Sequence, residues 1–285
     1  MKLISNMKLN RLKTQKYSSA YTNNLINVNK YRKLSKTLIP YIEKIKSSNI
    51  CKKNKSKDEN HYNDSFFIGG ANDNDGGTIE LLSQCFSENQ TFQELINDIN
   101  TQDFCNYVCS NLNLKPYTLV DHQKKITFSD IILKKRPCYL SLKLSGYQSG
   151  AGLAFHRDNR RKLVAMLFYL GFSDFLERDY GGTQLYSDKT NKQVFSRNNS
   201  DHIIDSSGLV LAHNHQPKGN SFIAFQVNDY SWHAVDKVNL EDGIYRLNLQ
   251  INFMIPRKYT FLAGCLKKLI NLLTNKSFRN LIYNF

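Results

Sequence analysis

The sequence predicts a mostly β domain with flanking helices, a sandwich or jelly roll whose strands lie between about residues 138 and 256. Three observations lead to this prediction. Helical spacing of apolar residues ends near residue 112, a period-two alternation begins at 138, and short apolar runs are then separated by Gly, Asn and Asp turns. Apolar residues make up 41% of the 285 residues, which is enough for a core and excludes a wholly disordered chain.

The net charge of +15 belongs to the two ends of the chain. Residues 1–57 hold 15 Lys and Arg against one acid, Glu43, and residues 257–285 hold six basic residues and no acid, so that residues 58–256 carry a net charge of −5. This excludes a nucleic-acid footprint over the whole domain. We expect residues 1–57 to be a basic, partly disordered extension and residues 58–285 to form the domain. Three roles for the extension stay open: a solvated tail, a weak contact with a polyanion or an anionic membrane, and targeting.

The segments outside the strands have weaker patterns. We expect a short helix over 34–46 that begins near Pro40, a linker over 47–64, a loop over 69–77 and two or three helices over 78–112. A basic amphipathic helix is expected over about 259–283, packed on the domain or lying on a membrane surface. The six cysteines include no C-x-x-C pair, which predicts inert free thiols in a reducing, cytoplasmic setting.

The strands are predicted from apolar runs and from alternation. Residues 163–170 and 221–227 are continuous apolar runs, and Leu140, Leu142 and Leu144 alternate with other residues. In the last strand, 246–253, Arg246 and the polar uncharged side chains that follow at every second position share one face. Such a face suits the interior of a barrel that encloses a polar site.

Two histidines and one carboxylate indicate a metal centre. His156 and Asp158 form His-x-Asp in an extended segment, so both side chains point to the same face. His233 follows the apolar strand 221–227, and two His with one carboxylate are the ligands of an open-faced Fe(II) site. Arg246, thirteen residues after His233, offers a two-pronged partner for a buried carboxylate.

Residues 140–256 resemble the iron(II)/2-oxoglutarate-dependent oxygenase superfamily, and its prolyl 4-hydroxylase branch most closely. The matching motifs, in chain order, are Tyr147 and Gly150, His156-Arg-Asp158, Arg161, Tyr169-Leu170, Gly181-Gly182-Thr-Gln-Leu185, Pro217-Lys-Gly219, Ile223-Ala-Phe225, His233-Ala-Val235 and Gly243-Ile-Tyr-Arg246. In the family the Arg usually stands about ten residues after the second His, with a Pro between. Here the interval is thirteen, and Lys237 stands where the Pro is common.

The resemblance implies a double-stranded β-helix with supporting N-terminal helices. It implies that His156, Asp158 and His233 bind Fe(II), that Arg246 and Tyr169 hold the distal carboxylate of 2-oxoglutarate, and that Tyr147 lies near this cosubstrate. The implied reaction consumes dioxygen and 2-oxoglutarate and hydroxylates a C–H bond. The substrate would be a prolyl or other residue of a protein or peptide, or a small molecule, and a need for ascorbate is left open.

Other interpretations stay open at this stage. A non-catalytic jelly-roll binding module with a polyanion-binding tail would need neither the metal nor Arg246, and a cupin-like metalloenzyme would use the His ligands without 2-oxoglutarate. If Arg246 does not hold the cosubstrate, Arg161 or Lys143 is the alternative cation. His213 and His215 have the spacing of a second metal pair but lack an evident third ligand, and Trp232 is expected in the core.

Overall fold

A computed structural model of the chain describes residues 7–13, 16–46, 51–53, 65–68, 77–121, 127, 136–159, 161–188, 208–256, 261 and 264–265. The four helices are α1 (Val28–Lys46), α2 (Gly77–Cys85), α3 (Gln90–Ile99) and α4 (Gln102–Asn111). The strands are β1 (Asn10–Lys13), β2 (Ser18–Thr22), β3 (Cys51–Lys53), β4 (Ser65–Ile68), β5 (Thr118–Leu119), β6 (Pro137–Tyr147), β7 (Leu153–His156), β8 (Lys162–Phe172), β9 (Thr183–Asp188), β10 (Leu209–His215), β11 (Phe222–Gln226), β12 (His233–Val235) and β13 (Arg246–Met254).

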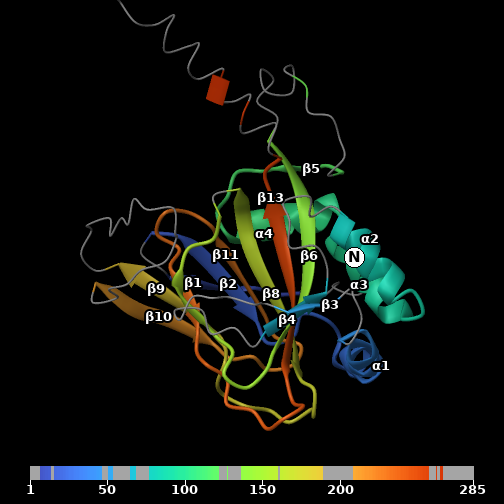
Figure 1. The fold of residues 1–285 in the computed structure, drawn as a ribbon. Helices are drawn as coiled ribbons and strands as arrows, with labels where there is room; N and C mark the ends of the chain where they lie inside the picture. The colour runs from blue at the N-terminus through green and yellow to red at the C-terminus, as the bar shows by residue number, and fades with distance from the viewer. Residues whose placement is uncertain are drawn as a thin grey trace, which may run out of the picture.

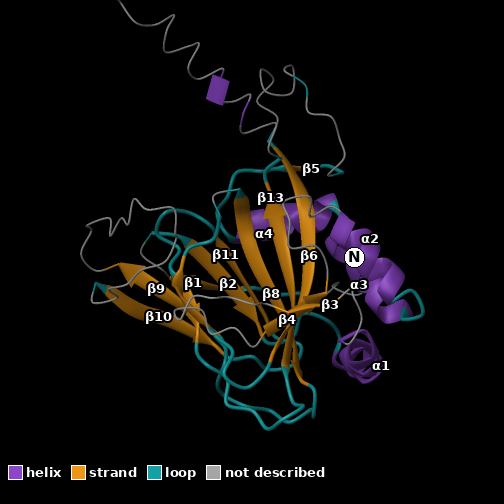
Figure 2. Ribbon diagram, in the orientation of Figure 1, coloured by secondary structure: helices purple, strands orange, loops and turns teal. Residues whose placement is uncertain are grey.

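The strands from β6 to β13 alternate between two antiparallel sheets (Figure 1). The main sheet runs β1-β2-β11-β8-β13-β6-β4-β3, with β5 added in parallel beside β6, and the minor sheet runs β10-β9-β12-β7. The chain thus crosses from one sheet to the other at nearly every connection, as in a double-stranded β-helix. This confirms the predicted jelly roll with flanking helices, and helices α1 to α4 lie on the far side of the main sheet from β9 and β10 (Figure 2).

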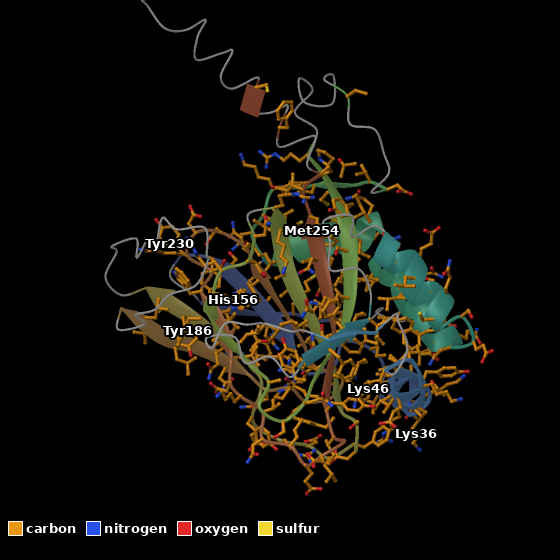
Figure 3. The ribbon with its side chains drawn as sticks, viewed as in Figure 1. Lys36, Lys46, His156, Tyr186, Tyr230 and Met254 are labelled. Atoms are coloured by element: carbon orange, nitrogen blue, oxygen red, sulfur yellow. The ribbon has the colours of Figure 1, made fainter. Side chains whose placement is uncertain are left out.

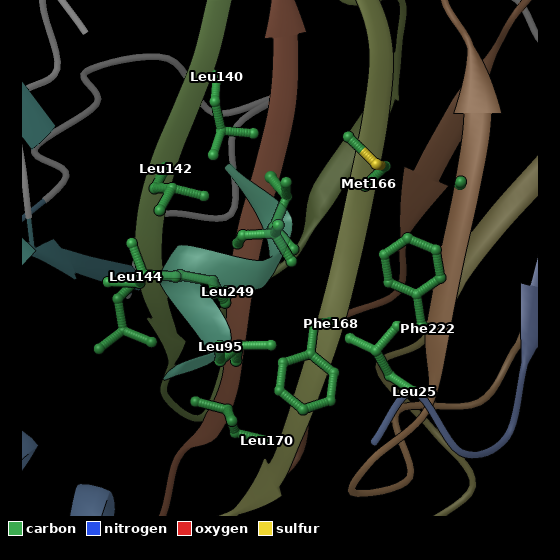
Figure 4. Packing of buried hydrophobic residues seen from close by; sticks show 14 of the residues in the cluster. Leu25, Leu95, Leu140, Leu142, Leu144, Met166, Phe168, Leu170, Phe222 and Leu249 are labelled. Atoms are coloured by element: carbon green, nitrogen blue, oxygen red, sulfur yellow. The ribbon is translucent and has the colours of Figure 1, made fainter. Parts of the chain in front are cut away.

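The largest core lies between the main sheet and these helices. Leu140, Leu142 and Leu144 of β6 are at most 2% exposed and pack with Leu249 of β13 and Leu95 of α3 (Figure 4). Leu247, Ile251 and Phe253 continue the apolar face of β13 in the same core. The predicted alternation is therefore confirmed, since the polar face of β13 is left to point the other way, toward the minor sheet.

The helices over 78–112 are confirmed as α2, α3 and α4, and two of them have clear start signals. The side chains of Asn89 and Thr101 accept hydrogen bonds from Phe92 N and Phe104 N, which caps α3 and α4. The expected start of the first helix near Pro40 is wrong. Helix α1 begins at Val28, where Asn27 Oδ1 accepts from Asn29 N, and Pro40 stands inside it on an exposed position.

Helix α1 tolerates this proline because its opposite side is buried. Proline removes one backbone hydrogen bond, but Leu34, Leu38 and Ile42 are completely buried in the main core. Each such side chain stabilises the fold by roughly 1.5–3 kcal/mol when removed from water. Tertiary packing therefore outweighs the local cost of Pro40.

Within residues 1–57, the described segments 7–13 and 16–46 contribute to the sheet and the core, whereas the sequence suggested a solvated extension. Strand β2 pairs with β11, so Ser18–Thr22 extend the main sheet, and α1 buries its apolar side in the main core. The high proportion of basic residues suggested a solvated tail. In the structure, basic side chains lie on the solvent-facing side of α1, where Lys30, Arg32, Lys33 and Lys36 are exposed. A polyanion or membrane contact through residues 1–57 stays a prediction.

Other expectations fall on segments with little description. The linker over 47–64 includes β3, which pairs with β4. The loop over 69–77 lies outside the described residues except for Gly77, and so does the C-terminal helix over about 259–283, apart from residues 261 and 264–265. Among the described residues no helix is both long and apolar enough to cross a bilayer.

Candidate metal centre and anion pocket

The two histidines face each other across neighbouring strands of the minor sheet. His156 ends β7 and His233 begins β12, and the antiparallel register sets them directly opposite each other. Their ring centroids lie 4.1 Å apart. In Figure 3, His156 lies on the other side of the main sheet from Lys36 and Lys46, the labelled residues of α1.

Asp158 completes a cluster with these imidazoles. It follows β7 by two residues, and its Oδ2 lies 3.7 Å from Nε2 of His233. One ligand atom from each of His156, Asp158 and His233 falls within 4.8 Å of the others. Among the described residues this is the one group of three or more His, Cys, Asp or Glu side chains that is close enough to hold a metal ion.

Both histidines present the same ring nitrogen to this cluster. Nδ1 of His156 lies 2.8 Å from the carbonyl of Ala154, and Nδ1 of His233 lies 3.0 Å from the carbonyl of Ser231. A carbonyl only accepts hydrogen bonds, so Nδ1 carries the proton in both rings and the lone pair is on Nε2. Burial, with a smaller contribution from His233, lowers the pKa of His156 to about 3, and burial also lowers the pKa of His233. Both rings are neutral at pH 7, as metal ligation requires.

Asp158 is held as a carboxylate. Burial acts to raise its pKa, but the Lys162 ammonium and the two imidazoles act more strongly, so that the pKa of Asp158 lies below its usual range. Lys162 Nζ donates to Oδ1 of Asp158 over 2.6 Å, while Oδ2 faces His233. One oxygen is thus fixed by the lysine and the other faces the imidazoles.

A second group of residues lies at the end of β13. Arg246 begins this strand, opposite Tyr147 of β6, and its side chain is 1% exposed. Its guanidinium lies over the Tyr147 ring at 4.0 Å and near the Tyr169 ring at 5.5 Å. Arg246 is not displaced although it follows His233 by thirteen positions, because Val238 and Leu240 of the intervening loop are buried against Tyr147.

Arg246 is a buried cation without a carboxylate partner among the described residues. Its Nη1 donates to the carbonyl of Gly181 and its Nη2 to Oδ1 of Asn248 over 3.3 Å, whereas Nε has no hydrogen-bond partner. An isolated buried charge costs several kcal/mol, so the site requires an anion. The alternative cation Arg161 points elsewhere, since its Nη2 donates to Tyr139 and its Nε to the carbonyl of Ile255.

The turn at Gly181 and Gly182 brings the backbone carbonyl of Gly181 to the guanidinium of Arg246. Gly181 has φ of +75°, and a Cβ there would lie 2.3 Å from a methyl of Val238. A Cβ on Gly182 would lie 2.0 Å from the backbone oxygen of His215. Both positions therefore need glycine.

The two groups share one cavity of about 180 Å³. Its lining includes His156, Asp158 and His233, and also Tyr147, Thr183 and Arg246. Tyr169 is fully buried beside it, with its hydroxyl 2.6 Å from Oγ1 of Thr183. The structure thus brings together the six residues that the sequence singled out. Sequence reasoning missed Thr183, which adjoins the Gly-Gly turn, and Lys162, whose signal was a lysine four residues after Asp158.

Two other expectations concern residues outside this cavity. His213 and His215 lie on β10 with ring centroids 5.9 Å apart, and no third His, Cys, Asp or Glu ligand joins them among the described residues. Trp232 is 4% exposed, as expected of a core residue, and Arg157 lies over its ring at 4.6 Å.

No family model and no curated protein matches the sequence. Solved structures that match the fold include a prolyl-4-hydroxylase from Pseudomonas putida, with 12% identity, a TM-score of 0.45, and coverage of 84% of this chain and 94% of that chain. Another is SnoN, a non-heme alpha ketoglutarate dependent epimerase from nogalamycin biosynthesis, with 6% identity, a TM-score of 0.48, and coverage of 85% and 80%. A third is OsALKBH1, with 12% identity, a TM-score of 0.41, and coverage of 86% and 99%.

Proposed function

We propose that this protein is an Fe(II)- and 2-oxoglutarate-dependent dioxygenase that hydroxylates an unactivated C–H bond. The observation that carries the proposal is the pairing of two features in one cavity. One is a cluster of two neutral imidazoles and one carboxylate, and the other is a buried Arg246 that lacks an anionic partner. A binding module requires neither feature, and a metalloenzyme without 2-oxoglutarate does not require the second.

The residues fit Fe(II). Two imidazole nitrogens and one carboxylate oxygen are the ligand set of a facial iron site, which leaves coordination positions open for other molecules. His156 and His233 are kept neutral by burial, and their Nδ1–H groups are anchored to backbone carbonyls. Such outer contacts orient the rings that bind the metal.

The residues also fit 2-oxoglutarate. Arg246 would bind the distal carboxylate through a charge-assisted pair of hydrogen bonds, which a guanidinium makes better than an ammonium. The Tyr169 hydroxyl, positioned by Thr183, would donate to the same carboxylate. Burial raises the pKa of Tyr169 although Arg246 acts against it, so the phenol stays protonated and able to donate. The Tyr147 ring lies under the guanidinium and fixes its plane.

Each residue then has one task. Bound Fe(II) with 2-oxoglutarate and dioxygen supplies the oxidising chemistry, which yields succinate, carbon dioxide and a hydroxylated product. His156, Asp158 and His233 hold the metal on one side, and Arg246 fixes the cosubstrate in one orientation. The apolar side chains of Leu153, Phe225 and Val235 line the same cavity and limit water near the reacting groups.

The substrate of the proposed reaction is described by its chemical class. A prolyl or other residue of a protein or peptide, or a small molecule, would receive the hydroxyl group, and ascorbate would serve to maintain Fe(II). The resemblance of residues 140–256 to the prolyl 4-hydroxylase branch favours a prolyl residue as the group that is hydroxylated.

Succinate formation tests the proposal. The purified full-length protein in air is expected to convert 2-oxoglutarate to succinate slowly without substrate, and only when Fe(II) is added. His156→Ala, Asp158→Ala and His233→Ala should each abolish this turnover, because a facial site loses a third of its ligands. Lys218→Met is the matched control, since Lys218 is half exposed and pairs with Glu177 away from the cavity. Near-normal turnover in His233→Ala would contradict the proposed ligand set.

A further inference from the structure

A second cavity lies apart from the proposed metal site and is larger. Its volume is about 470 Å³, against about 180 Å³ for the cavity of the metal site, and no described residue lines both. Residues from the first half of α1, from the end of β8 with the loop that follows, and from the turn before β11 line it. Lys36, at this second cavity, lies on the other side of the main sheet from His156 (Figure 3). We call it the side cavity.

The walls of the side cavity are mostly apolar and tightly packed. Leu170 and Phe172, at the end of β8, are at most 2% exposed, and Pro217 is also buried. The Tyr31 hydroxyl donates to the carbonyl of Leu170 over 2.9 Å. A Cβ on Gly219 would lie 1.8 Å from that hydroxyl oxygen, so the turn before β11 needs glycine to approach α1 this closely. The side cavity is therefore formed before any ligand binds.

Two large apolar side chains of the loop after β8 line the side cavity and also face water. Phe175 is 56% exposed and Leu176 is 62% exposed. Phe175 has φ of +62°, a left-handed conformation that is unfavourable for a bulky residue. The turn is nevertheless fixed, because Phe175 N donates to the carbonyl of Phe172 over 2.9 Å. Arg178 adds two hydrogen bonds to the Asp174 carboxylate, over 2.8 and 2.5 Å. An exposed apolar pair on a fixed turn is typical of a surface that another molecule covers.

The side cavity carries an excess of positive charge. Arg32 and Lys36 line it from α1, and both are exposed. They stand four residues apart on one helix face, where like charges repel each other. In the described part of the chain, no acidic side chain pairs with either of them. Glu177 is the acid among the lining residues, and it lies 3.6 Å from Lys218, so that this pair cancels in charge.

We propose that the side cavity binds a small amphipathic anion, a molecule with one carboxylate or phosphate group and an apolar body. Arg32 and Lys36 pair with the anionic group, which also removes their mutual repulsion. The apolar body packs against Phe172 and is covered by Phe175 and Leu176. A volume of about 470 Å³ falls within the roughly 300–1,000 Å³ of small-molecule sites, which favours such a ligand over a segment of a protein. Neither Fe(II) nor 2-oxoglutarate takes part, so this inference does not rest on the proposed function.

Ligands with one alkyl chain and different head groups test this inference. Dissociation constants for the full-length protein are measured by calorimetry at low ionic strength, with each ligand below the concentration at which it forms micelles. Octanoate is compared with octanamide, and octyl phosphate with octan-1-ol. Each pair differs in charge while keeping the chain, and the two anions separate a carboxylate from a phosphate preference.

The wild-type protein should bind at least one anion about fivefold more tightly than its neutral partner, as expected for an ion pair at a site open to water. The double variant Arg32→Gln/Lys36→Gln should lose this preference. Lys33→Gln is the matched control and should keep it, because Lys33 is an exposed lysine of the same helix that does not line the side cavity. Equal binding of anion and neutral partner by the wild type would overturn the inference, and so would a preference that the double variant keeps, since the anion would then bind elsewhere.

The apolar half of the site is tested by Phe175→Gly. Glycine adopts a φ of +62° without strain, so the turn is kept while the ring is removed. This variant should weaken the binding of an anion and of its neutral partner by the same factor, and unchanged affinities for both would contradict the proposed site. Binding of the peptide N-acetyl-Glu-Leu-Glu-amide to the wild type, with no binding of any octyl ligand, would also overturn the inference and assign the side cavity to a protein segment.

Discussion

Replacing Arg246 by lysine keeps the positive charge and removes the planar fork. In the structure the guanidinium is 1% exposed, uses Nη1 and Nη2 for Gly181 and Asn248, and lies over the Tyr147 ring. An ammonium cannot keep these contacts and also bind both oxygens of a carboxylate. A charge-assisted hydrogen bond contributes about 1.5–3 kcal/mol, so the dissociation constant for 2-oxoglutarate should rise by about 10-fold to 150-fold.

Anaerobic titration of the Fe(II)-loaded variant with 2-oxoglutarate measures this change directly. The affinity for Fe(II) should be kept, because Arg246 is not one of the three residues proposed to bind the metal. Arg161→Lys is the matched control, since Arg161 contacts Tyr139 and Ile255 and should leave the affinity for 2-oxoglutarate unaltered. An unchanged dissociation constant in Arg246→Lys would refute the role of this residue as the carboxylate partner.

Three further predictions concern the fold. A chain that starts at residue 58 should lose cooperative thermal unfolding, because it lacks β2 and the buried side of α1, and a sharp transition at the wild-type temperature would show these elements to be dispensable. Burial, with a contribution from His213, lowers the pKa of His215 to about 3, whereas the pKa in the unfolded chain is about 6.5. The neutral His215 ring therefore makes its full contribution to the free energy of unfolding above pH 6.5, and this contribution is lost as the pH falls toward 3. His215→Asn should therefore flatten the fall of unfolding free energy between pH 6.5 and 4.5 by roughly 1.4 kcal/mol per pH unit, and an unaltered slope in urea titrations would contradict this. Gly182→Ala should destabilise the protein by roughly 1–3 kcal/mol in the same assay, since its Cβ would meet the His215 carbonyl, and a neutral effect would mean that the turn can move.

The central strands and the site could be predicted because their signals are local. The alternation in 246–253 sets Arg246 on the polar face of a strand, and the burial of Leu247, Leu249 and Ile251 on the other face follows from the same pattern. The His-x-Asp spacing places His156 and Asp158 on one face of an extended segment. The third member of the cluster, His233, is brought opposite His156 by a strand pairing that a single sequence does not encode locally.

The N-terminal region could not be predicted in the same way. Its lysines and asparagines suggest a solvated segment, and Pro40 suggests a helix start. The actual helix is stabilised by contacts of Leu34, Leu38 and Ile42 with residues far along the chain, and β2 is stabilised by pairing with β11. Such long-range contacts outweigh local propensity. The pairing of Lys162 with Asp158 was missed because it depends on the turn between β7 and β8.

We propose that the cluster of His156, Asp158 and His233 binds Fe(II) and that Arg246 binds 2-oxoglutarate in the same cavity. Anaerobic titration of the full-length protein with Fe(II) and then 2-oxoglutarate tests it most directly, with the weak visible charge-transfer absorption of the chelated cosubstrate as the signal. We expect this absorption to saturate at one Fe(II) and one 2-oxoglutarate per chain, and to be lost in His233→Ala. If saturating 2-oxoglutarate produced no such absorption in the iron-loaded protein, the proposed binding of iron and cosubstrate in this cavity would be refuted.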